Sequence, residues 1–204
     1  MRSLLLVDLQ NDFMPGGALA VADGDAVVGV ANALMPRFSL VVASQDWHPA
    51  DHGSFASAHP GRKLGDVIDL AGVEQVLWPD HCVQEAPGAS FHSGLDVAGI
   101  DRVVRKGTDP AVDSYSAFFD NDRRRDTGLA AFLEKSGAEE LVVLGLATDY
   151  CVKYTVLDAC GLGFGVTVIT DGCRAVDLAH GDGDRAFAEM RSAGARLVTL
   201  DELD

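Results

Sequence analysis

Short apolar runs alternate along this chain with segments of helical pattern, and this alternation limits the fold more than any other feature. The runs are continuous, as in Leu4-Leu5-Leu6-Val7, which is typical of strands covered on both faces. Strands that alternate with helices indicate an α/β fold with a mainly parallel sheet and helices on both faces. A length of 204 residues fits one such domain, residues 1–204.

The apolar pattern predicts the positions of the strands and helices, and it is interrupted in one segment. The expected strands are Ser3–Asp8, Ser39–Ser44, Arg102–Lys106, Glu140–Leu146, Val166–Thr170 and Arg196–Leu200, and the expected helices are Asp25–Met35, Asp126–Lys135, Asp149–Cys160 and Asp182–Ala193. From Asp46 to about Gly99 the rhythm breaks, and only Val76–Trp78 is expected to be regular there. This insertion holds five of the six histidines. A long irregular insertion in a compact domain is usually functional.

Charge excludes two classes of partner. The chain has 16 basic and 31 acidic residues, a formal charge of −15, which repels nucleic acid and anionic lipid. No apolar stretch reaches the length of a membrane span, and the N-terminal run is too short for a signal peptide. The four cysteines form no Cys-x-x-Cys pair, so we expect free thiols in a reducing cytoplasm. The oligomeric state is left open.

Chemically useful residues follow four of the predicted strands. Asp8, Asp46 and Lys106 end or follow the first three, and residues 147–149 lead from the fourth to Cys151. The carboxyl ends of parallel strands share one edge of a sheet, where ligands bind. Taken singly, such an aspartate often caps a helix and such a lysine is often a surface residue. Together they predict a site at this edge.

Cys151 is the candidate nucleophile. With Thr148 or Asp149 as the N-cap, it would lie in the first turn of a helix, where the dipole favours a thiolate and backbone N–H groups can bind an oxyanion. Asp8 could accept the thiol proton, and Lys106 could hold Asp8 and favour the thiolate. The alternative is a buried, inert cysteine. A histidine partner brought close through space also stays open.

A metal site is the second candidate. Asp46 and His48 lie two residues apart, so their side chains point the same way on an extended segment, and His81 could complete the set. One oxygen and two nitrogen ligands with open positions suit a divalent metal, with zinc as first choice and iron or manganese as alternatives. His52 has no clear spacing partner, and its contact with the metal is left open.

Seven stretches together resemble the nicotinamidase (pyrazinamidase) family of isochorismatase-like cysteine hydrolases. They cover residues 7 to 176 in order: VDLQNDF, QDWHPADHGSFAS, VLWPDHCVQ, KGTD, DSYSAFFDN, GLATDYCVKYTVLDA and VITDGCRAV. DWHP, WPDHC and ATDYCV in combination distinguish nicotinamidases from isochorismatases. The stretch VQEAPGASFH differs slightly in sequence from the family pattern, and we expect this difference to affect the conformation of a loop and not catalysis.

The resemblance implies a six-stranded parallel sheet and hydrolysis of nicotinamide, and also of pyrazinamide, through a cysteine thioester. It assigns catalysis to Asp8, Lys106 and Cys151, and metal ligation to Asp46, His48 and His81. It assigns substrate binding to Phe13, Trp78, Tyr115 and Ala147. It also implies a cis Leu146–Ala147 peptide bond that turns the Ala147 N–H toward the substrate carbonyl oxygen.

Three rival functions remain open at this point. One is hydrolysis of another small amide or carbamoyl compound, although a substrate without a ring nitrogen would not need the metal. Another is a metal-only hydrolase in which a bound hydroxide attacks and Cys151 is structural. The last is a metal-binding or small-molecule-binding protein without catalysis, against which the acid, lysine and thiol set argues.

Overall fold

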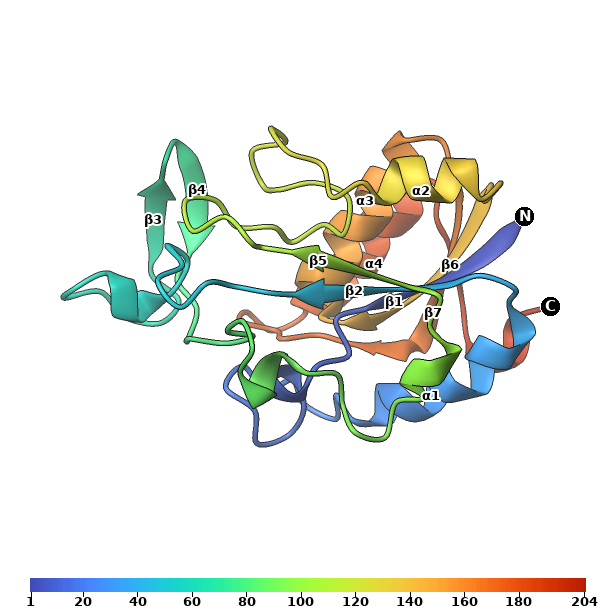
Figure 1. Ribbon diagram of the computed structural model, residues 1–204, viewed down its shortest axis with the longest axis horizontal. Coiled ribbons are helices and arrows are strands. Elements are labelled where there is room, and N and C mark those ends of the chain that lie inside the picture. Colours follow the sequence, from blue (N-terminus) through green and yellow to red (C-terminus); the bar gives the residue numbers. More distant parts are fainter.

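Every pairing in the central sheet is parallel, as the alternating pattern predicts. The computed structural model describes residues 1–204. The six strands stand in the order β5-β2-β1-β6-β7-β8 (Figure 1). Their bounds are β1 Arg2–Val7, β2 Val41–Asp46, β5 Arg102–Lys106, β6 Glu140–Leu146, β7 Gly165–Arg174 and β8 Arg196–Val198. The predicted six-stranded parallel sheet is confirmed.

The apolar run of β1 explains why this strand is central. Leu4, Leu5, Leu6 and Val7 are all fully buried, which requires cover on both faces of the sheet. Each such side chain contributes roughly 1.5–3 kcal/mol through burial. The strand lies between β2 and β6, with Leu4 opposite both Val41 and Val142.

Four α-helices cover the sheet from both sides (Figure 1). Helix α1 packs on one face, and α2, α3 and α4 lie on the other. Their bounds are α1 Ala26–Leu34, α2 Leu129–Lys135, α3 Lys153–Gly161 and α4 Asp182–Ser192. All four fall within one to three residues of the predicted helices, apart from the start of α3. None of the helices combines the length and apolar character that crossing a membrane demands.

The insertion contains a β-hairpin that the sequence reading missed. Strands β3 (Val67–Leu70) and β4 (Val73–Val76) pair antiparallel and stand apart from the main sheet (Figure 1). Residues Ala71 and Gly72 form the turn with φ values of 54° and 92°. A glycine in a two-residue turn is the signal for such a hairpin. The prediction of regular structure at Val76–Trp78 alone was therefore wrong.

The segment before α3 also differs from the prediction. Residues Thr148–Val152 form a π-helical turn, and α3 follows it directly. Cys151 therefore lies in the first helical turn after β6, as predicted, and this turn is π-helical. The turn follows β6, and the Leu146–Ala147 peptide bond between them is cis, as the family resemblance implies.

Neither predicted N-cap residue caps this turn. Ala147 occupies the N-cap position, with no side-chain cap. The Asp149 carboxylate instead accepts hydrogen bonds from the backbone N–H groups of Val176 and Asp177, at 3.0 and 2.8 Å. These donors follow β7 and lie far away in sequence. Tertiary hydrogen bonds have therefore replaced the local cap that Thr148 or Asp149 was expected to supply.

Candidate active site

The carboxyl ends of four adjacent strands bring the predicted residues together. Asp8 directly follows β1, Asp46 ends β2, and Lys106 ends β5. Beyond the end of β6, the π-helical turn presents Cys151 to the same edge. Because β5, β2, β1 and β6 are consecutive in the sheet, residues up to 143 positions apart in the chain become neighbours.

Lys106 lies at the centre of this group. Its Nζ is 2.9 Å from Asp8 Oδ2, 3.0 Å from Asp46 Oδ1 and 3.4 Å from Cys151 Sγ. It also donates to the Ser114 carbonyl oxygen at 2.9 Å. Burial lowers the pKa of Lys106, but the two carboxylates outweigh that effect and hold the pKa well above its usual value. Lys106 is therefore a fixed buried cation that bridges both carboxylates and the thiol.

Asp8 is fully buried and held on two sides. Its Oδ1 accepts a hydrogen bond from Ser44 Oγ at 2.6 Å, while Oδ2 contacts Lys106. Burial raises the pKa of Asp8, and the nearby Lys106 only partly offsets this increase. A raised pKa makes this carboxylate a stronger base than an exposed aspartate.

The Cys151 thiol differs electrostatically from what the sequence indicated. Burial raises the pKa of Cys151 well above its usual value, and the Lys106 ammonium offsets this only in part because Asp8 and Asp46 act in the opposite direction. We expected Lys106 and the start of the helix to favour the thiolate form of Cys151. That expectation did not allow for the burial of the thiol or for the two nearby carboxylates. The thiol therefore needs a base, and Asp8 contacts the same Lys106 Nζ atom as the thiol does.

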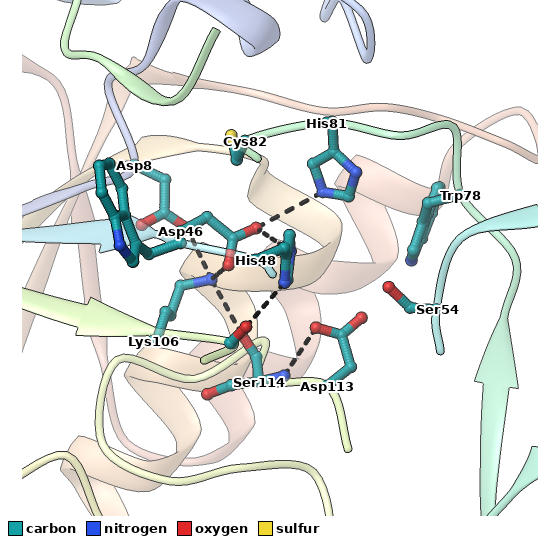
Figure 2. A network of polar contacts seen from close by, with 12 residues as sticks. Asp8, Asp46, His48, Ser54, Trp78, His81, Cys82, Lys106, Asp113 and Ser114 are labelled. Carbon is teal, nitrogen blue, oxygen red and sulfur yellow. Dashed lines mark hydrogen bonds and ion pairs between the residues drawn. The ribbon is translucent and has the colours of Figure 1, made fainter. Parts of the chain in front are cut away.

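Asp46, His48 and His81 form a buried cluster beside this group, as Figure 2 shows. Asp46 Oδ2 lies 3.0 Å from His48 Nε2 and 3.5 Å from His81 Nε2. Potential ligand atoms of the three side chains all lie within 4.8 Å of one another. The same carboxylate touches Lys106 through its other oxygen. Asp46 therefore joins the cluster to the thiol side of the site.

Backbone carbonyls set the orientation of both imidazole rings. His48 Nδ1 lies 3.0 Å from the Gly107 carbonyl oxygen, and His81 Nδ1 lies 2.8 Å from that of Pro79. In the neutral rings, Nδ1–H donates to these carbonyls and leaves the Nε2 lone pairs directed at Asp46. A carbonyl partner on the other ring nitrogen is the usual support for a metal-ligating histidine.

This arrangement fits a divalent cation. Two nitrogen lone pairs and a carboxylate oxygen converge, and their electrostatic repulsion needs a positive charge between them. Burial lowers the pKa of His48, but the Asp46 carboxylate outweighs this effect and raises the pKa, so the cluster favours a positive charge. One oxygen and two nitrogen ligands match a site for zinc or a similar metal that keeps open positions.

Close packing around the cluster explains one glycine of the KGTD motif. A Cβ atom on Gly107 would lie 2.5 Å from His48 Cε1 and 2.7 Å from its Nδ1. The φ of Gly107 is +64°, a conformation that side chains rarely adopt. Any larger residue at this position would displace the His48 ring from Asp46.

Gln10 fixes the backbone of Asp46. Its side chain donates to the Asp46 carbonyl oxygen and accepts from the Asp46 N–H, both at 2.7 Å. Gln10 is fully buried, so this two-point contact is shielded from water. The sequence reading passed over Gln10, although it lies within the VDLQNDF stretch that carried the resemblance.

His52 and Asp113 form a second buried group around His48. The His48 and His52 ring centroids lie 4.3 Å apart, and potential ligand atoms of His48, His52 and Asp113 lie within 4.8 Å of one another. His52 Nδ1 contacts Ser54 Oγ at 2.7 Å, while its buried Nε2 has no hydrogen-bond partner. Asp113 was missed as a site residue, although it begins the DSYSAFFDN stretch.

A cavity connects the two halves of the site. Its lining includes all four residues expected to bind substrate: Phe13, Trp78, Tyr115 and Ala147. Cys151, Asp46 and His81 line it as well. The sequence reading did not identify Leu19, Asp113, Tyr150 and Val176 as further lining residues. Tyr150 could have been predicted as a lining residue from its position next to Cys151 in the sequence.

One wall of the cavity is held by a hydrogen-bond network. The Tyr115 hydroxyl accepts from Trp78 Nε1 at 3.2 Å and from Gln75 Nε2 at 3.1 Å. Gln75 comes from strand β4 of the hairpin, is buried, and also donates to Asp113 Oδ2 at 3.0 Å. No local sequence signal marked Gln75, because its role depends on where the hairpin docks.

Comparisons with known proteins agree with this architecture. The model of the family described as isochorismatase domain matches residues 2–202. The nicotinamidase of Escherichia coli strain K12 is 57% identical over 98% of this chain and 95% of its own length. An Acinetobacter baumanii nicotinamidase and pyrazinamidase structure matches with a TM-score of 0.96 and 42% identity, over 100% of this chain and 98% of that one.

A structure with zinc is also similar. The pyrazinamidase of Pyrococcus horikoshii, solved in complex with zinc, matches with a TM-score of 0.78 and 35% identity, over 97% of this chain and 98% of that one. These matches extend over nearly the whole chain. Together, the family model and these near full-length matches show that this chain belongs to the isochorismatase family, in the branch of the nicotinamidases.

Proposed function

We propose that this protein is an amidase that hydrolyses nicotinamide to nicotinate and ammonia through a thioester on Cys151. One observation carries the proposal: the buried Cys151 thiol, which Lys106 joins to Asp8, lines the same cavity as Asp46 and His81 of the buried aspartate and histidine cluster. The near full-length identity to nicotinamidases supports the same reaction and substrate class. Pyrazinamide, a ring analogue, is proposed as a second substrate.

The first half-reaction transfers the acyl group to sulfur. Asp8 accepts the proton of the Cys151 thiol as sulfur attacks the carboxamide carbon, and a tetrahedral oxyanion forms. The backbone N–H groups of Ala147 and Cys151 stabilise this oxyanion, each contributing ~3 kcal/mol. Asp8 returns its proton to the departing nitrogen, the C–N bond breaks, and ammonia leaves behind a thioester.

The second half-reaction restores the thiol. A water molecule loses a proton to Asp8 as it attacks the thioester carbon. The C–S bond then breaks, sulfur regains a proton, and nicotinate is released. Lys106 keeps its charge throughout, because its contacts with Asp8 and Asp46 hold its pKa high. Its proposed role is to orient Asp8 and to stabilise negative charge on the Cys151 sulfur.

Asp46, His48 and His81 are the proposed ligands of a divalent metal, with zinc as the first choice. Such a metal supplies an electrophilic position for the pyridine nitrogen of the substrate and orients the ring. The chain's own residues do the rest of the positioning. Phe13 and Trp78 line the cavity and are proposed to hold the ring between them, which directs the carboxamide toward Cys151.

Ammonia release from nicotinamide by the purified protein tests this function directly. Cys151→Ala removes only one sulfur atom, so the fold should survive while turnover falls below a few per cent of wild type. Circular dichroism controls for folding. A folded variant that retains more activity would rule out covalent catalysis. Absence of ammonia from wild type, with release from another small amide, would favour the rival hydrolase reading.

Alkylation separates the two remaining rivals from this proposal. Iodoacetamide should inactivate the protein in step with labelling of Cys151, both with and without a chelator present. Labelling of Cys151 without any loss of activity would support a metal-only hydrolase with a structural cysteine. Zinc binding without hydrolysis of any amide would leave a metal-binding protein.

A further inference from the structure

Asp12 joins two separate loops of the site through one carboxylate. Its Oδ2 accepts a hydrogen bond from the Cys82 N–H at 2.7 Å, and its Oδ1 accepts one from the Ala18 N–H at 3.2 Å. Asp12 precedes the cavity residue Phe13, and Cys82 follows the metal-ligand candidate His81 on the segment that Figure 2 shows. One side chain therefore links the loop of the aromatic wall to the loop of the histidine.

The carboxylate has a close-fitting environment on a third side. A Cβ atom on Gly88 would lie 2.1 Å from Asp12 Oδ2 and 2.4 Å from Oδ1. Gly88 belongs to the short 3-10 turn Pro87–Ala89, which packs against the turn carrying Phe13. A glycine is therefore needed at residue 88 for the chain to approach the carboxylate.

The Cys82 backbone needs such a partner. Its φ is +47°, a left-handed conformation that residues with a side chain rarely adopt. A hydrogen bond from its N–H to an ionised carboxylate is of the stronger kind and favours this conformation. The conformation at Cys82 sets the exit of the chain from His81.

The rings on either side of this link touch each other. Phe13 and His81 have centroids 5.7 Å apart at an interplanar angle of 63°, an edge-on contact. A shift between the two loops would move the histidine away from Asp46 and the phenylalanine away from the cavity. Asp12 itself does not line the cavity, so it can act only through these neighbours.

We propose that Asp12 is a positioning residue that fixes His81 for metal binding and Phe13 for substrate binding. The inference rests on the proposed function for its substrate, but its metal half does not need turnover. Asp12→Asn keeps the shape of the side chain and one acceptor oxygen. Its amide group then faces either the Cys82 N–H or the Ala18 N–H, so one of these donors loses its partner.

Asn11 offers a matched control in the same turn. Its Nδ2 donates to the Pro87 carbonyl oxygen at 2.8 Å, so it ties the turn carrying Phe13 to the 3-10 turn Pro87–Ala89 but does not contact Cys82. Asn11→Ala therefore removes a loop-to-loop hydrogen bond without touching the link to His81. A role of Asp12 in general loop stability would make the two variants behave alike.

The experiment measures zinc affinity by competition with a chelator, the visible spectrum of the cobalt-substituted protein, and KM and kcat for nicotinamide. Asp12→Asn should weaken zinc binding about 10- to 100-fold, the usual effect of losing a group that orients a metal ligand. It should also alter the cobalt spectrum and raise KM more than it lowers kcat. Asn11→Ala should stay within about twofold of wild type. Gly88→Ala, which displaces the carboxylate directly, should reproduce the effect of Asp12→Asn.

Wild-type zinc affinity and KM in folded Asp12→Asn and Gly88→Ala would overturn the inference. So would equal losses in Asp12→Asn and Asn11→Ala. Failure of the proposed function is a separate result, because wild-type protein would then release no ammonia from nicotinamide. In that case the zinc titration and the cobalt spectrum still decide the role of Asp12.

Discussion

The Nζ atom of Lys106 and the Oδ2 atom of Asp8 lie 2.9 Å apart, and both side chains are completely buried. An ion pair removed from water in this way contributes little net stability, yet loss of one partner leaves an uncompensated charge that costs roughly 3–5 kcal/mol. The pair is therefore difficult to explain by stability alone. Its contact with the Cys151 sulfur through Lys106 gives it a catalytic explanation.

Lys106→Ala and Asp8→Asn should each reduce kcat by at least about a thousandfold, because groups that act as one unit lose most of their effect when any member is removed. Ammonia release and urea denaturation measure activity and folding together. Arg102→Ala, on the exposed part of the same strand, should keep wild-type kcat. Near-normal kcat in Lys106→Ala would show that its assigned role is wrong.

Loss of the metal should damage substrate orientation more than the chemistry at sulfur. His48→Ala should empty the cluster and lower kcat/KM at least about 100-fold, the usual cost of misplacing a substrate by about 1 Å. The chelated wild-type protein should still form an acyl adduct on Cys151 with an activated aryl thioester. Single-turnover mass spectrometry detects the adduct.

His59→Ala is the control for this test. His59 lies in the same insertion, but its Nε2 contacts the Gly53 carbonyl oxygen and takes no part in the cluster. This variant should keep its metal and its activity. If alkylation shows an accessible Cys151 thiol and the adduct still forms only after metal is restored, the metal takes part in the chemistry.

Gln75→Ala should loosen the cavity wall without disturbing the thiol. Tyr115 would lose one of its two hydrogen-bond donors and Asp113 would lose its amide partner, so the nicotinamide KM should rise about 10-fold with a smaller change in kcat. Steady-state kinetics provide the measurement. Glu74→Gln, an exposed neighbour on the same strand, is the control. Equal KM values in both variants would contradict a role for Gln75.

Alkaline pH should destabilise the fold partly through Cys173. Burial raises the pKa of this thiol from its ordinary 9.0 to about 12. Because the folded pKa lies above the unfolded value, the stabilising contribution is complete below pH 9 and is lost as pH rises toward 12. At pH 10.5, ionisation in the unfolded chain should lower the free energy of unfolding by about 2 kcal/mol.

Urea denaturation of wild type and Cys173→Ala at pH 8 and pH 10.5 measures this contribution. The substitution removes a buried sulfur, so it should cost a similar amount at both values through lost packing. The variant should show the smaller decrease in stability between the two pH values. Parallel decreases in the two proteins would mean that Cys173 does not ionise on unfolding.

The sheet could be predicted from the sequence because a strand that is buried on both faces consists almost entirely of apolar residues. The continuous run from Leu4 to Val7 is typical of a strand that is covered on both faces of a parallel sheet, and these residues are buried. The same logic brought Asp8 and Lys106 to one edge. The spacing of Asp46 and His48 placed both side chains on one side of an extended segment, where they meet at 3.0 Å.

Features set by contacts distant in sequence could not be predicted. Asp149 looks like a local helix cap, yet its carboxylate binds N–H groups beyond β7, and the turn before α3 is π-helical. Gln75 looks in the sequence like a polar residue of an irregular insertion, and it becomes buried only because the unpredicted hairpin docks against Tyr115. The raised pKa of Cys151 follows from burial beside two carboxylates, which no pattern near the cysteine records.

The position of β1 in the sheet has a consequence for synthesis on the ribosome. This strand is made first, but its partner β6 ends at Leu146, so one side of the apolar run from Leu4 to Val7 stays unpaired until most of the chain has been translated. Pairings between such distant segments form slowly and leave apolar strand edges exposed to aggregation in the meantime. Cys151, which follows β6, can therefore meet Asp8 at the end of β1 only after this late pairing has formed.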